Sequence, residues 1–183
     1  MAFLTRQQFT VIAETKAGRK SLQNMLYEAL AENRAEAVTS IFLSHCHTDV
    51  SIVEEAVSFF KGLRADVFVD WMIETMPEKP NGKTANILKE MMNKNDKFIL
   101  LATNNAVRSR WCNWELGIGD TYKLNTDKLA IFPLADNRGD WVGNEYLQIY
   151  PRIEPSSQLD TGQSFEVIYP SGRSKLLSRW IMS

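Results

Sequence analysis

The residues best suited to chemistry lie in one short stretch, Ser109-Arg110-Trp111-Cys112-Asn113-Trp114-Glu115, directly after the apolar run 98–102. The apolar run predicts a buried strand, and Ser109 is a residue type that caps the start of a helix. Trp111 and Glu115 are four residues apart and therefore share one helical face. Open α/β sheets bind their ligands beyond the carboxyl ends of the strands, so this carboxylate beside an aromatic ring is a candidate for ligand chemistry.

A solvated surface position is the alternative for Glu115, because most glutamates are exposed. Its neighbours Trp111, Trp114 and Leu116 are large and apolar, however. They favour a helix start that faces the sheet, and with it a functional Glu115. The two tryptophans have their own alternative as core residues, the commoner fate of tryptophan at helical spacing.

The elements that must position this stretch alternate along the chain. Short apolar or β-branched runs predict four strands, at 39–43, 67–69, 97–102 and 128–134. Amphipathic segments between them predict helices, one beginning at Ser51 in a capping box with Glu54, then 84–93 and 109–122. This alternation predicts an α/β fold with a parallel sheet covered on both faces.

The two ends of the chain follow this pattern less closely. Residues 7–37 read as helical, with an interruption at Gly18, and we expect residues 1–38 to form an N-terminal helical extension. Beyond Asp136 the pattern weakens, and a strand at 165–169, a turn at 170–172 and an amphipathic segment at 175–181 are expected. The domain is thus predicted to span 39–183, with its core in 39–135.

Composition narrows the function classes. A net charge of −1 argues against nucleic acid or an anionic membrane as the main partner, since both need a clustered positive field. No apolar stretch approaches the roughly 20 residues of a membrane-spanning helix, and the N-terminus lacks a signal-peptide pattern. Cys46 and Cys112 fall in separate motifs and are expected to be reduced thiols. These features together predict a cytoplasmic protein.

Four segments occur in the order and spacing of a TIR (Toll/interleukin-1 receptor) domain, and the resemblance extends over 39–134. Three of them are Ile41-Phe42-Leu43-Ser44-His45 followed by Asp49, then Val67-Phe68-Val69-Asp70-Trp71, and then Ser109, Trp111, Cys112 and Glu115. The fourth, Pro80-Asn81-Gly82-Lys83, stands at the position of the family's BB loop but lacks the usual Arg-Asp-x-x-Pro-Gly form. The chain therefore resembles the TIR family, and the resemblance implies a flavodoxin-like fold.

The resemblance also implies an activity. In the TIR enzymes the glutamate that corresponds to Glu115 is essential for cleaving the nicotinamide–ribose bond of NAD, so NAD is expected as a substrate and no cofactor is expected. Ser44, His45, Asp70, Trp71 and Trp111 are the residues expected to contact the substrate. The product would be ADP-ribose or a cyclic ADP-ribose isomer.

A metal centre at His45-Cys46-His47 is not expected. Alternate residues of an extended segment point to opposite sides, so the two imidazoles should diverge. No second His or Cys cluster is present in the sequence to complete a site.

Three functional readings remain open. A small TIR protein without other recognisable domains resembles the signal-producing component of Thoeris-type anti-phage systems, whose cyclic product acts on a separate effector protein. A non-enzymatic adaptor that self-associates through Met72–Lys83 is the second reading. An enzyme similar to nucleoside deoxyribosyltransferases is the third; it would also cleave an N-glycosidic bond.

Overall fold

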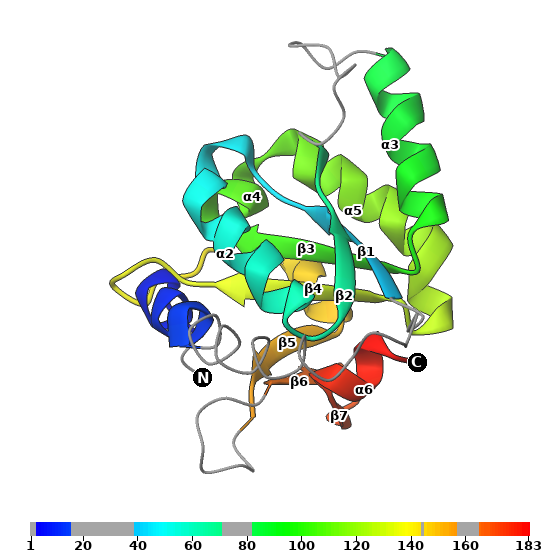
Figure 1. The fold of residues 1–183 in the computed structure, drawn as a ribbon. Coiled ribbons are helices and arrows are strands. Elements are labelled where there is room, and N and C mark those ends of the chain that lie inside the picture. The colour runs from blue at the N-terminus through cyan, green and yellow to red at the C-terminus, as the bar shows by residue number, and fades with distance from the viewer. Residues whose placement is uncertain (1–2, 16–38, 71–81, 144, 157–164) are drawn as a thin grey trace, which may run out of the picture.

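The structure is a computed structural model, and it describes residues 3–15, 39–70, 82–143, 145–156 and 165–183 (Figure 1). A seven-stranded sheet runs through its centre. The strands are β1 (Thr39–Ser44), β2 (Ala65–Phe68), β3 (Lys97–Thr103), β4 (Leu129–Leu134), β5 (Arg152–Pro155), β6 (Phe165–Ile168) and β7 (Ser174–Leu176). The main helices are α2 (Val50–Lys61), α3 (Gly82–Lys94), α4 (Asn104–Arg108), α5 (Arg110–Lys123) and α6 (Leu177–Ile181).

The strand order in space is β2-β1-β3-β4-β5-β6-β7. The strands from β2 to β5 pair in parallel, and β6 and β7 continue the sheet in antiparallel pairs. The order 2-1-3-4-5 is that of flavodoxin-like sheets, which bind ligands where the winding reverses between β1 and β3. The α/β, flavodoxin-like prediction is confirmed, and the carboxyl ends of β1 and β3 form the edge at which a ligand site is expected.

Helices cover both faces of the sheet because side chains alternate along each strand. On β1, Ile41 and Leu43 pack in the hydrophobic cluster that contains α2 and α6. Phe42 packs on the opposite face, with side chains from α3, α4 and α5. Ser44 lies two residues beyond Phe42, so the alternation directs its side chain toward the α5 face.

The N-terminal helix, residues 6–15, belongs to the first of these clusters. Phe9 is fully buried, and its ring lies 5.1 Å from that of Phe132 on β4 and 5.5 Å from that of Phe59 on α2. Thr5 pairs with Ala135, directly after β4. The described part of the predicted extension therefore packs on the sheet. The boundary at residue 38 lies outside the described residues and stays a prediction.

Of the two helix starts predicted from capping residues, the structure confirms that of α5 and contradicts that of α2. Ser109 caps α5, and its hydroxyl accepts a hydrogen bond from the Cys112 amide at 3.3 Å. The prediction that α2 begins with a capping box at Ser51 is wrong, because α2 begins at Val50 and its N-cap is Asp49. The Asp49 carboxylate makes no cap hydrogen bond, since it is bound by side chains from other elements.

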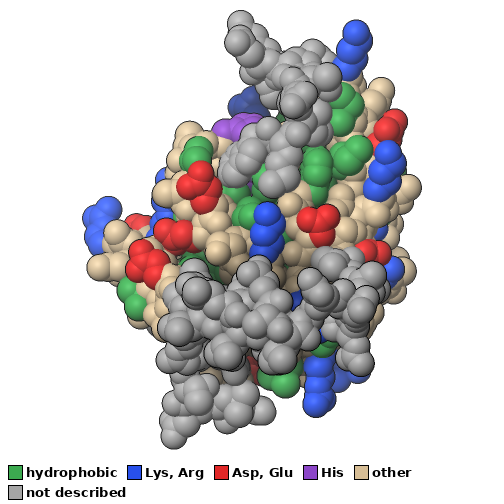
Figure 2. Space-filling view, viewed as in Figure 1, with side chains coloured by type: hydrophobic (Ala, Val, Ile, Leu, Met, Phe, Trp, Pro, Cys, Tyr) green, Lys and Arg blue, Asp and Glu red, His purple; other side chains and the backbone are tan. Residues whose placement is uncertain are grey.

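None of the described helices combines the length and apolar character needed to cross a bilayer. On the face drawn in Figure 2, acidic and basic side chains are interspersed. This mixture agrees with the net charge of −1.

Replacing Phe9 with alanine tests whether the N-terminal helix is part of the core. We expect Phe9→Ala to lower the free energy of unfolding by about 3–5 kcal/mol, because it removes a fully buried ring from an aromatic cluster. Urea denaturation followed by circular dichroism measures this loss. Val11→Ala is the control on the same helix: Val11 is 58% exposed and should change the value by less than about 0.5 kcal/mol. Equal stability of the two variants would contradict the packing.

Candidate active site at the β1–α5 junction

The centre of the candidate site is a buried contact between β1 and α5. The Ser44 hydroxyl, at the carboxyl end of β1, donates a hydrogen bond to Glu115 Oε2 at 2.5 Å. Both residues are buried, and Glu115 is only 3% exposed. A carboxylate in so dry a position is held by a specific donor, as buried polar groups require.

The position of Glu115 follows from how α5 packs. Cys112, Glu115, Leu116 and Gly119 form the buried stripe of this helix, at spacings of three and four residues. A Cβ atom on Gly119 would lie 2.9 Å from the Phe98 ring, so the glycine permits close approach to β3. The Cys112 thiol donates to the backbone carbonyl of His45 at 3.2 Å. The helix start is therefore fastened to the segment that follows β1.

Burial changes the acidity of both α5 groups. Desolvation raises the pKa of Glu115 to about 8, with a further rise from the charge of Asp70; the hydrogen bonds from Ser44 and Trp111 act in the opposite direction. Desolvation also raises the pKa of the Cys112 thiol to about 12. Cys112 is thus a neutral structural thiol near pH 7, while Glu115 is poised to exchange a proton in this range.

Two histidines converge on Asp70, beside this contact. His45 Nε2 lies 3.4 Å from Asp70 Oδ1, and His47 Nε2 lies 3.4 Å from Asp70 Oδ2. The expectation that the two imidazoles diverge is therefore wrong. It assumed an extended segment, but a 3₁₀ helix begins at His47 (His47–Asp49) and turns its side chain back toward Asp70.

The tryptophans predicted to border the site have different outcomes. Trp111 is half-buried and lies close enough to Glu115 to lower the pKa of that acid, so it does lie against the acid. Its ring stacks on Trp114 at a centroid distance of 4.8 Å. Trp71 and most of the predicted assembly loop Met72–Lys83 lie outside the described residues. The structure thus brings together Ser44, His45, Asp70, Trp111 and Glu115; that each contacts a substrate stays a prediction.

Sequence reasoning missed the hydrogen-bond network around Asp49. This buried carboxylate accepts hydrogen bonds from Thr103 at 2.5 Å, Asn105 at 2.7 Å and Arg6 at 2.8 Å. It joins the N-terminal helix, the segment after β1 and the end of β3. Asp49 did match the TIR pattern, but its partners are 43–56 residues away in sequence and no local signal indicates them.

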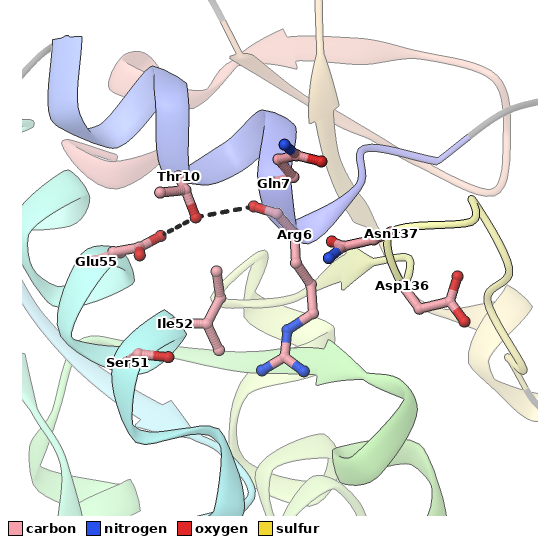
Figure 3. Close-up of a pocket in the computed structure, with 8 residues that line it drawn as sticks. All are labelled: Arg6, Gln7, Thr10, Ser51, Ile52, Glu55, Asp136 and Asn137. Carbon is pink, nitrogen blue, oxygen red and sulfur yellow. Dashed lines mark hydrogen bonds between the residues drawn. The ribbon is translucent and has the colours of Figure 1, made fainter.

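A polar pocket of about 550 Å³ opens on the opposite face of the sheet from α5 (Figure 3). Its lining comes from the N-terminal helix, α2 and the segment after β4: Arg6, Gln7, Thr10, Ser51, Ile52, Glu55, Asp136 and Asn137. The Arg6 guanidinium at its wall is already paired with Asp49. Glu115 does not line this pocket, which is therefore separate from the candidate site.

The chain resembles a TIR-type protein. It is 24% identical over 82 residues to a protein of Cytobacillus dafuensis named "Putative cyclic ADP-D-ribose synthase TIR2". The match covers 43% of this chain and 22% of the length of that protein. No protein-family model matches the chain. The similarity supports the TIR resemblance that the motifs indicated, and it is limited to part of each chain.

The stability of the protein should depend on the protonation of Glu115. Its pKa is about 8 in the folded state and about 4.5 when unfolded, so the folded protein holds the proton more tightly. This contribution to stability is fully present below about pH 4.5 and is lost as the pH rises through 8. We expect the melting temperature to fall by roughly 5–10 °C between pH 5 and pH 9.

Glu115→Gln, which imitates the protonated acid, should remove most of this dependence in differential scanning fluorimetry. Glu54→Gln on α2 is the matched control, since Glu54 is exposed and should leave the wild-type profile unchanged. A Glu115→Gln profile parallel to that of the wild type would show that Glu115 does not hold its proton in the folded protein.

Proposed function

We propose that this protein cleaves the bond between nicotinamide and ribose in NAD, and that Glu115 is the catalytic carboxylate. The observation that carries the proposal is the buried Glu115 carboxyl group. Ser44 holds it beside the carboxyl ends of β1 and β3, where the winding of the flavodoxin-like sheet reverses. The TIR motif around it and the similarity to a protein named as a cyclic ADP-D-ribose synthase support the same reaction class.

The reaction needs only one acidic residue. Glycosidases that break a bond to an alcohol oxygen use two carboxylates, one of which protonates the leaving group. Nicotinamide leaves a pyridinium as a neutral molecule, so no proton has to be delivered. What remains is positive charge on the ribose ring in the transition state, and one preorganised anion can stabilise it.

Glu115 must be ionised to act in this way, and its environment makes ionisation depend on the substrate. In the free protein, desolvation and the charge of Asp70 favour the protonated acid. The pyridinium of NAD brings a positive charge close to Glu115, and this favours the carboxylate. The anion would therefore form when the cationic substrate binds, and it would interact most strongly with the transition state.

The neighbouring residues have supporting roles in this proposal. Ser44 holds one carboxylate oxygen and lets the other face the ribose. Trp111 flanks the acid and offers a ring face for the nicotinamide. The buried Asp70 adds negative charge that attracts the cationic ring.

The fate of the ribosyl cation determines the product. Attack by water gives ADP-ribose, and attack by a nucleophile of the same nucleotide gives a cyclic isomer. We extend the proposal to a cyclic product that signals to a separate effector protein in anti-phage defence, in line with the sequence resemblance. We further propose that TIR surfaces of this chain self-associate to complete the site.

Substitution of Glu115 tests the catalytic role. Glu115→Gln keeps the size and a hydrogen-bond acceptor for Ser44 but removes the charge, so nicotinamide release from NAD should fall by about 10²–10³-fold. Liquid chromatography with mass spectrometry measures nicotinamide and also identifies the linear or cyclic product. Glu90→Gln on α3 is the control, because Glu90 is exposed, and it should keep wild-type activity.

The assay must include concentrated protein, since self-association is part of the proposal. Equal activity of the wild type and Glu115→Gln would exclude the catalytic role. Cleavage of free nucleosides in preference to NAD would instead favour the deoxyribosyltransferase-like alternative. A folded wild type that releases no nicotinamide at high protein concentration would favour the adaptor.

The pH profile of the reaction gives a second prediction. kcat/KM reports groups in the free enzyme, so it should rise with pH and level off above about 8, where Glu115 is ionised. The kcat profile reports the complex and should rise at lower pH, because the bound pyridinium favours the anion. Initial rates from pH 5 to pH 10 measure both. Superimposable profiles with a midpoint near 4.5 would contradict a buried, protonated Glu115.

A further inference from the structure

The cluster of His45, His47 and Asp70 has the composition of a transition-metal site. One ligand atom from each residue lies within 4.8 Å of the others. Two imidazoles and one carboxylate are ligands that suit zinc and other divalent first-row metals. The three residues come from the segments that directly follow β1 and β2, two parallel neighbouring strands. The sheet therefore holds His45 and Asp70 in place.

The distances are too long for good hydrogen bonds between these side chains. The two nitrogen–oxygen separations are both 3.4 Å, which is longer than a good hydrogen bond between these atoms. Ligand atoms about 2.0–2.1 Å from a tetrahedral zinc ion lie about 3.3 Å from one another. The three candidate ligand atoms lie within 4.8 Å of one another, so the exposed His47 side chain would have to move closer to complete the site. Asp70 Oδ1 is buried and accepts no hydrogen bond from the described residues.

The tautomer of His45 also favours a metal ligand at Nε2. Its Nδ1 lies 3.0 Å from the carbonyl oxygen of Leu43, which can only accept, so Nδ1 must carry the hydrogen. In the neutral ring this leaves the lone pair on Nε2, the atom that faces Asp70. Metal-binding histidines commonly have this arrangement, in which a backbone carbonyl fixes the ring and raises its basicity.

We propose that His45, His47 and Asp70 bind a divalent transition-metal ion, with zinc as the best match. Three protein ligands leave a fourth position open, as in zinc sites that accept water or a substrate atom. His47 is 62% exposed, so its side chain is free to rotate onto an ion held by the two buried ligands. The proposal concerns binding alone and does not depend on NAD cleavage.

Zinc binding to untagged protein tests the site. We expect one Zn²⁺ per chain in competition with a chromogenic chelator, and no displacement by Mg²⁺, which prefers oxygen ligands. Co²⁺ in place of zinc should give the visible absorption of a low-symmetry site with nitrogen and oxygen ligands. His47→Ala and Asp70→Asn should each weaken zinc binding by at least about 10–100-fold.

Two control variants make the result specific. Asp66→Asn removes an exposed carboxylate on β2, the strand that Asp70 follows. Cys46→Ser removes the thiol between the two histidines. Both variants should bind zinc with the affinity of the wild type. His47→Ala carries little risk of misfolding because His47 is exposed. The proposal would be overturned if the wild type did not bind zinc. It would also be overturned if His47→Ala and Asp70→Asn both bound zinc as tightly as the wild type.

Discussion

The hydrogen bond between Ser44 and Glu115 is the interaction on which the candidate site depends. It places an ionisable group where water is excluded, and the protein must compensate for that burial. The compensation requires the end of β1 to meet the N-terminal half of α5. This contact depends on the packing of Gly119 against Phe98 and of the Cys112 thiol against the His45 carbonyl. Helix packing and acidity are therefore coupled at this junction.

Negative charge is concentrated on one side of this junction. Asp70 raises the pKa of Glu115 by its charge, and the same carboxylate lies 3.4 Å from a ring nitrogen of each of the two histidines. Any cation that enters this region, whether a pyridinium or a metal ion, reduces the repulsion between Asp70 and Glu115. A metal ion at Asp70 would consequently lower the pKa of Glu115. The proposed activity and the proposed metal site are electrostatically linked, although each is tested separately.

A second carboxylate, Asp49, holds the edge of the sheet together through side-chain hydrogen bonds. Its partners Arg6, Thr103 and Asn105 are all donors, so its buried carboxylate oxygens are satisfied by hydrogen bonds. Asp49 and Glu115 differ in the number and kind of their hydrogen-bond donors. Asp49 has three and includes an ion pair, whereas the hydroxyl of Ser44 and the indole of Trp111 only partly offset the desolvation of Glu115.

The sequence by itself determined the alternation of strands and helices, the Ser109 cap and the pairing of Trp111 with Glu115, because these depend on residues within one turn or one strand. It did not determine that His47 turns back to Asp70, that Asp49 binds Arg6, or that β5, β6 and β7 extend the sheet. Those features join residues far apart in the chain. Only the tertiary structure decides them, since such contacts exist only after the strands have packed.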